Sequence, residues 1–170
     1  MAGETILVVE DEGISAIEIK ECLESLGYQV PSIAKSGNEA IQEAFSIEPD
    51  LILMDITLKG DMDGIDAATI IRSFMDIPLI YLTALDDVET FNRMSETQAN
   101  AYLIKPIEEA ELRNNIQLAL KNYETRQREM ANEKMLGLKD VQIFMRSALP
   151  ELVANIPISE RSGFLSRFMR

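Results

Sequence analysis

The chain has no histidine and only one cysteine among its 170 residues. Without histidine it offers no imidazole as a metal ligand, general base or phosphoryl carrier. Any metal it binds is therefore expected to be a hard cation held by oxygen ligands. The single cysteine, Cys22, cannot form an internal disulfide, and its place in an apolar helical pattern predicts a small buried side chain.

Long apolar segments are also missing. No run approaches the roughly 20 residues that a membrane-spanning helix needs, and the opening residues, MAGETILVVEDE, lack the basic and apolar parts of a secretion signal. We therefore expect a cytoplasmic protein without a membrane span. Hydrophobic residues make up 46% and charged residues 26%, which is typical of a globular protein, and the length fits one domain with a small appendage.

The net charge of −13 is unevenly distributed. Residues 1–120 carry 7 Lys and Arg residues against 23 Asp and Glu residues, whereas residues 121–170 carry 9 against 6, a balance of +3. The first part is expected to repel nucleic acid and attract cations.

Apolar runs alternate with helical patterns over the first 120 residues. The runs predict strands at 5–9, 28–34, 51–54, 79–82 and 101–104. The segments between them predict helices at 14–26, 37–47, 65–75 and 86–98, with a further helix from about 108. Ser36 is expected to cap the second helix, with Ala40, Ile41, Ala44 and Phe45 facing inward. This alternation predicts a doubly wound α/β fold around a five-stranded parallel sheet.

Chemically active side chains follow four of these strands. They are Glu10 and Asp11, Asp55, Thr83 and Lys105. Taken alone, Asp55 is typical of a polar turn. Because the carboxyl ends of parallel strands share one edge of the sheet, we expect all five side chains to converge. Three adjacent carboxylates need a cation or raised pKa values, and Mg²⁺ suits them. With a lysine and a hydroxyl to face an anion, the set indicates a phosphoryl-transfer site with Asp55 as nucleophile.

Residues 5–120 resemble the receiver domain of two-component response regulators. The resemblance rests on ILVVEDE at 6–12, LILMD at 51–55, LTA at 82–84 and KP at 105–106. It implies a flavodoxin-like sheet of order 2-1-3-4-5. It also implies that Asp55 accepts a phosphoryl group from a histidine kinase, and that Mg²⁺ is held by four groups: Glu10, Asp11, Asp55 and the backbone carbonyl of Thr57.

The same resemblance implies that Thr83 and Tyr102 form a switch pair. The hydroxyl would move toward the phosphoryl group and the ring would turn inward, changing the surface formed by the fourth helix, fifth strand and fifth helix. Without the resemblance, an aromatic ring on a strand is expected to be plain core. The loop after Asp55 departs from the commonest family pattern, because Lys59 replaces a proline and Gly64 comes one residue late.

The last helix continues beyond the part that resembles a receiver. We expect a receiver domain at 1–122 and a helical C-terminal extension at 123–170, interrupted at Gly137 and followed by shorter amphipathic segments. Such an extension favours protein interaction, self-association or packing against the receiver domain, because its apolar faces need a partner. DNA binding and contact with a membrane surface are the alternatives.

These expectations define a response regulator rather than an enzyme with outside substrates. Its partners would be a sensor histidine kinase or phosphotransfer protein, and an output protein or second copy bound through the fourth-to-fifth-helix face and the tail. A DNA-binding transcription regulator is the alternative. A Mg²⁺-dependent aspartyl-phosphate phosphatase is disfavoured, because haloacid-dehalogenase-like enzymes need a second aspartate where this chain has Thr57. Only slow self-dephosphorylation is expected.

Overall fold

The computed structural model describes residues 3–84 and 88–147. The chain divides into two compact units, Met1–Glu124 and Thr125–Arg170. The elements are β1 (Ile6–Val9), α1 (Gly13–Ser25), β2 (Ile33–Ala34), α2 (Gly37–Ile47), β3 (Leu51–Asp55), α3 (Gly64–Phe74), β4 (Leu79–Thr83), α4 (Val88–Glu96), β5 (Ala101–Ile104) and α5 (Glu109–Ser147).

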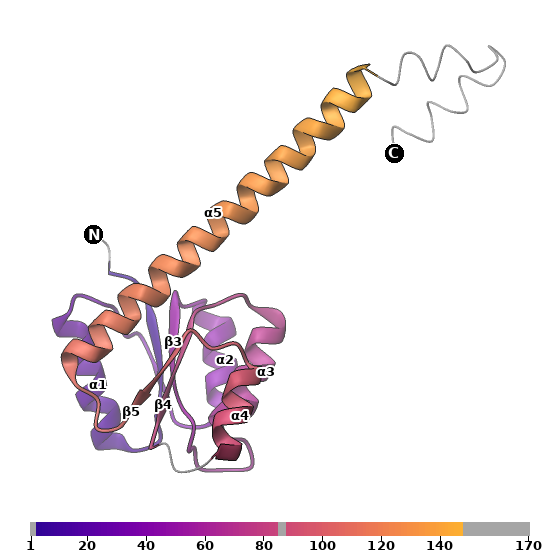
Figure 1. Cartoon of the computed structure of the whole chain (residues 1–170). Helices are drawn as coiled ribbons and strands as arrows, with labels where there is room; N and C mark the ends of the chain where they lie inside the picture. Colours follow the sequence, from indigo (N-terminus) through magenta and orange to yellow (C-terminus); the bar gives the residue numbers. More distant parts are fainter. Residues whose placement is uncertain (1–2, 85–87, 148–170) are drawn as a thin grey trace. The chain divides into compact units, whose positions relative to one another are not determined.

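The strands form one parallel sheet in the order β2-β1-β3-β4-β5 (Figure 1). This confirms the doubly wound fold and the strand order that the resemblance implied. Val9 pairs with Met54, and Asp55 pairs with Leu82, so β1, β3 and β4 end at nearly the same level. The side chains that follow these strands are thereby brought to one edge of the sheet.

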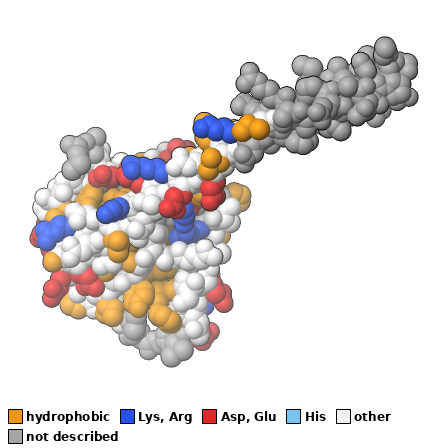
Figure 2. Space-filling model, turned by 45° about the horizontal axis from the view of Figure 1, so that its top comes forward, with side chains coloured by type: hydrophobic (Ala, Val, Ile, Leu, Met, Phe, Trp, Pro, Cys, Tyr) orange, Lys and Arg blue, Asp and Glu red, His pale blue; other side chains and the backbone are white. Residues whose placement is uncertain are grey.

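Both faces of the sheet are covered by helices, which is why its central strands read as unbroken apolar runs. Alternate side chains of the strands enter two separate core clusters. One cluster includes residues of α2, α3 and α4, and the other includes residues of α1 and α5, on opposite faces of the sheet (Figure 1). Apolar side chains also reach the surface, where they lie among charged ones (Figure 2).

Helix α2 confirms its predicted cap and all of its predicted inward face except one residue. The Ser36 hydroxyl accepts a hydrogen bond from the backbone N–H of Glu39 at 3.3 Å. Phe45, however, is 46% exposed and lies against Phe74 of α3, with ring centroids 6.0 Å apart. Ala40 and Ala44 are fully buried and Ile41 packs against the core, as predicted, so only the prediction for Phe45 was wrong. Cys22 of α1 is only half-buried, which also corrects the expectation for it.

Helix α5 runs without a break through Gly137 to Ser147, so the predicted interruption was wrong. A glycine inside a helix costs about 1 kcal/mol relative to alanine, which good helix formers on either side can offset. From position 148 onward, the shorter amphipathic segments predicted after Gly137 lie outside the described residues. Among the residues that the structure describes, no helix is long and apolar enough to cross a membrane.

Candidate functional site

Three carboxylates meet at the carboxyl edge of the sheet. Glu10 and Asp11 follow β1, and Asp55 is the last residue of β3. One oxygen from each lies within 4.8 Å of the others. Glu10 and Asp55 are buried, with exposed fractions of 1% and 5%. The structure therefore brings together the acidic residues that the sequence placed at separate strand ends.

Lys105, which follows β5, lies among these carboxylates. Its Nζ donates to Glu10 Oε2 at 2.6 Å and to Asp55 Oδ2 at 2.8 Å. The Lys105 side chain is 27% exposed, whereas those of its two partners are nearly buried. The ammonium therefore balances two carboxylates that burial would otherwise leave uncompensated.

The charges of this cluster alter its proton affinities. Burial raises the pKa of Asp55, the hydrogen bond from Lys105 opposes that shift, and the nearby Glu10 charge adds to it; the pKa ends above its ordinary value. Burial tends to lower the pKa of Lys105, but its hydrogen bonds to Asp55 and Glu10 outweigh burial and raise it. The lysine thus stays charged, and it favours the ionised form of Asp55.

Further hydrogen bonds fix the two buried carboxylates. The backbone N–H of Glu12 donates to Glu10 Oε1, and the Ser15 hydroxyl from α1 donates to Glu10 Oε2, both at 3.1 Å. The backbone N–H of Thr57 donates to Asp55 Oδ1 at 3.1 Å. Ser15 was not singled out from the sequence; the only signal was a hydroxyl in the first turn of the helix after an acidic strand end.

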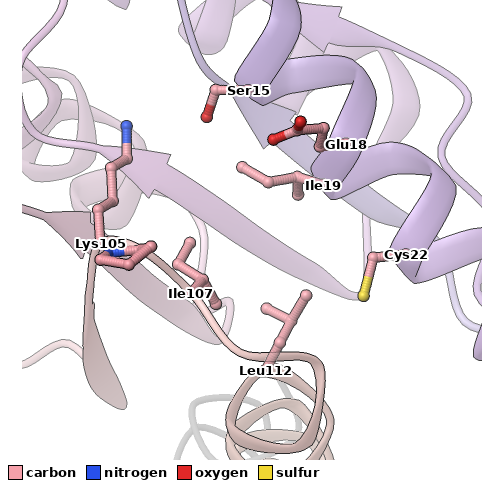
Figure 3. A pocket seen from close by; sticks show the side chains of 8 residues that line it. Ser15, Glu18, Ile19, Cys22, Lys105, Ile107 and Leu112 are labelled. Carbon is pink, nitrogen blue, oxygen red and sulfur yellow. The ribbon is translucent and has the colours of Figure 1, made fainter.

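A pocket of about 250 Å³ lies beside the cluster, between α1 and the connection from β5 to α5. Figure 3 shows Ser15, Glu18 and Cys22 along one wall, with Lys105 and Ile107 on the other. The Lys105 stem lines this pocket while its ammonium contacts the carboxylates.

The predicted switch residues have different surroundings. Thr83, the last residue of β4, is buried with 4% exposed. Tyr102 of β5 is 48% exposed and packs edge-to-face against Phe91 of α4, with ring centroids 5.9 Å apart. The reading of Tyr102 as plain core is therefore wrong. Its place on an edge strand accounts for this exposure, because β5 has a neighbouring strand on one side only.

Residues 6–117 match the family model described as response regulator receiver domain. The chain belongs to the response regulator receiver family. It is 35% identical over 118 residues to the transcriptional regulatory protein PdtaR of Mycobacterium tuberculosis, covering 69% of this chain and 57% of PdtaR. It is 31% identical over 138 residues to the DNA-binding response regulator MtrA of Mycolicibacterium smegmatis, covering 81% and 58%. The chain thus spans a little over half the length of these relatives.

Solved receiver domains share the fold. The signal receiver domain of a modulated diguanylate cyclase from Desulfovibrio desulfuricans G20 aligns with a TM-score of 0.70 at 34% identity, covering 73% of this chain and 98% of that one. The receiver domain of the sensor histidine kinase PA1611 from Pseudomonas aeruginosa PAO1, with magnesium coordinated in its active site cleft, gives 0.65 at 34% identity, covering 71% and 99%.

The loop after Asp55 is where this receiver domain departs from the commonest pattern. Gly64, although one residue late, still lies against the end of β3, because a Cβ there would come within 1.9 Å of the Asp55 carbonyl oxygen. Gly60, with φ of 118°, adopts a backbone conformation that side-chain-bearing residues rarely adopt. Lys59, in the same loop, places its Nζ 3.1 Å from Asp11 Oδ2. The sequence marked Lys59 only as a departure and predicted no contact for it.

Proposed function

We propose that the protein is a phospho-accepting response regulator in which Asp55 receives a phosphoryl group from the phosphohistidine of a histidine kinase or phosphotransfer protein. One observation carries the proposal: a buried carboxylate at a strand end contacts the Lys105 ammonium at 2.8 Å, and two more carboxylates lie beside it. An ammonium next to a nucleophilic carboxylate suits a reaction whose product is a more highly charged anion.

The donor set fits a magnesium ion. Glu10, Asp11 and Asp55 present hard oxygen ligands within reach of one another, and the chain has no histidine with which to prefer a softer metal. Mg²⁺ would be held by these residues and the Thr57 backbone carbonyl. When bound, it would neutralise charge on phosphoryl oxygens.

The chain's own residues supply the remaining requirements of the transfer. An oxygen of Asp55 forms a bond to phosphorus while the bond between phosphorus and the donor imidazole breaks, and the electron pair stays on the imidazole nitrogen. Lys105 holds Oδ2 and the Thr57 N–H holds Oδ1, so the carboxylate is oriented before the donor arrives. Lys105 then balances the new phosphoryl charge. With Thr57 rather than an aspartate two residues on, only slow self-dephosphorylation is expected, without turnover on outside substrates.

The signal would leave the domain through α4, β5 and α5. Thr83 stands at the end of β4, one strand from Asp55, and its hydroxyl would move toward the phosphoryl group. Tyr102 and Phe91 form an exposed aromatic pair on this face. Inward rotation of Tyr102 would change the apolar surface offered to an output protein or to a second copy of the chain, with the C-terminal extension contributing.

Phosphorylation by a small acyl phosphate tests the proposal. Intact-mass analysis after incubation with acetyl phosphate and Mg²⁺ should show one added phosphoryl group in the wild type and none in Asp55→Asn. Asp61→Asn is the matched control, because Asp61 is an exposed acid in the same loop. Equal modification of wild type and Asp55→Asn would contradict the assignment, as would a wild type that stays unmodified with Mg²⁺ present.

A DNA-binding regulator remains the second candidate, because two relatives are named a transcriptional regulatory protein and a DNA-binding response regulator. The charge of residues 121–170 permits it. A gel shift at several salt concentrations, with these residues present and removed, separates the candidates. Binding that weakens with salt and requires residues 121–170 would favour the DNA-binding role.

A further inference from the structure

The three carboxylates of the site are balanced by two different lysines. Lys105 contacts Glu10 and Asp55, whereas Lys59 contacts Asp11 at 3.1 Å. The two lysines differ in their exposure to solvent: the Lys59 side chain is 83% exposed, and that of Lys105 is 27% exposed. Lys105 is thus an integral part of the carboxylate cluster, whereas Lys59 extends to this cluster from a surface loop.

Asp11 is the carboxylate that both Lys59 and a bound metal ion would contact. Its side chain is only 13% exposed, and Lys59 contacts one of its oxygens. Asp11 is also one of the three residues whose oxygens lie close enough to share a cation. A metal ion and the Lys59 ammonium would therefore use the same small group of oxygens and repel each other.

We propose that Lys59 is a displaceable counter-ion, which occupies Asp11 in the metal-free protein and is displaced when a divalent cation binds. The inference rests on the metal site of the proposed function and adds that Lys59 regulates how tightly this site binds the cation. By competing at Asp11, Lys59 weakens the affinity for the cation and raises the cation concentration at which the site fills. In the metal-free protein it relieves repulsion among the three carboxylates.

The exposure of Lys59 makes displacement feasible. An ion pair with one well-exposed partner is held weakly, because water screens the charges and the long side chain loses freedom in one geometry. Lys59 can therefore leave Asp11 without any change in the fold. Lys105 has no such freedom, since it bridges two nearly buried carboxylates.

A direct measurement of cation affinity tests this role of Lys59 and requires no phosphoryl transfer. Mn²⁺ is titrated against the full chain and free Mn²⁺ is followed by electron paramagnetic resonance, with Mg²⁺ added as a competitor. The variants are Lys59→Met, which keeps the length of the side chain, and Lys59→Arg, which keeps the charge. Lys20→Met is the matched control, because it removes the same charge from a lysine of α1 that pairs with Glu24.

Lys59→Met should bind Mn²⁺ and Mg²⁺ about two- to fivefold more tightly than the wild type at low salt, which is the range for a partly exposed ion pair. Lys59→Arg should stay close to the wild type, and Lys20→Met should change much less than Lys59→Met. The gain in Lys59→Met should shrink as salt is added, because screening weakens the competing charge.

Thermal unfolding gives a second signature. In chelator, Lys59→Met should melt below the wild type, because Asp11 loses its counter-ion, and added Mg²⁺ should raise its Tm by more. Equal affinities for Lys59→Met and Lys20→Met, or weaker binding by Lys59→Met, would overturn the role of Lys59 and leave the metal site standing. A wild type that binds no Mn²⁺ would overturn the metal site and this inference together.

Discussion

Lys105 and Asp55 are 50 positions apart in the sequence, yet their side chains meet at 2.8 Å. The contact joins the end of β3 to the residue after β5, two strands away in the sheet. Lys105 also reaches Glu10 after β1, so one ammonium links the ends of three strands. The contacts of Lys105 that orient the carboxylates of the site therefore also stabilise this edge of the domain.

Replacing Lys105 with Met should destabilise the metal-free protein by about 2–3 kcal/mol at pH 7, because two nearly buried carboxylates lose their counter-ion. Urea unfolding in chelator measures the loss. Mg²⁺ should restore part of the lost stability by supplying another positive charge. Lys20→Met, which removes a lysine from a surface pair, should cost less than about 1 kcal/mol. Equal losses in the two variants would contradict the bridging role of Lys105.

The ion pair between Asp63 and Arg93 should make stability depend on pH. Burial opposes the shift, but hydrogen bonds from Arg93 and the Asp66 N–H hold the pKa of Asp63 below its ordinary value of 3.8. As pH falls past 3.8, the unfolded chain takes up this proton before the folded protein does. The stability from this group is therefore present above that pH and is lost as pH falls through the depressed folded pKa.

Asp63→Asn isolates this effect, because asparagine also caps helices while the ion pair is lost. The wild type should be more stable than the variant by about 0.5–1 kcal/mol at pH 7, and the gap should close below pH 4. Urea unfolding at a series of pH values checks this. Asp61→Asn is the control, and a gap for Asp63→Asn that stays constant with pH would rule the ion pair out as its cause.

Gly64→Ala should be strongly destabilising, because the added Cβ would lie 1.9 Å from the Asp55 carbonyl oxygen. The loop must shift to relieve this clash, at a cost of about 2–4 kcal/mol. Gly13→Ala is the matched control: both glycines begin a helix, and a Cβ at Gly13 meets nothing within 4 Å. That control should lie within about 0.5 kcal/mol of the wild type by urea unfolding. Similar losses for both would show that the close approach is not the reason.

The Tyr102 ring should become less accessible when Asp55 is activated with beryllofluoride and Mg²⁺. Fluorine NMR of fluorotyrosine-labelled protein, with Tyr102 assigned from Tyr102→Phe, reports its exposure to a paramagnetic cosolute. The signal should lose accessibility in the wild type and keep it in Thr83→Ala. Tyr81, fully buried and hydrogen-bonded to Thr97, is the internal control. Loss of accessibility in both the wild type and Thr83→Ala would show that the movement of Tyr102 does not depend on Thr83.

The sequence alone determined the sheet, its faces and the set of chemically active residues. Apolar runs without polar alternation occur where strands are buried on both sides, and four of the five runs are followed by a side chain with chemistry to offer. A parallel sheet brings such ends to one edge whatever the loops do. The meeting of Asp55 with Glu10 and Lys105 was therefore predictable from the sequence.

Only the tertiary structure decided which side chains face solvent and which loop residues enter the site. Tyr102 lies outward because β5 is an edge strand, and Phe45 lies outward because two alanines of α2 face the core. The contacts of Lys59 with Asp11 and of Ser15 with Glu10 join different segments. Local patterns describe one element at a time, whereas these contacts depend on how loops and helices close around a finished sheet.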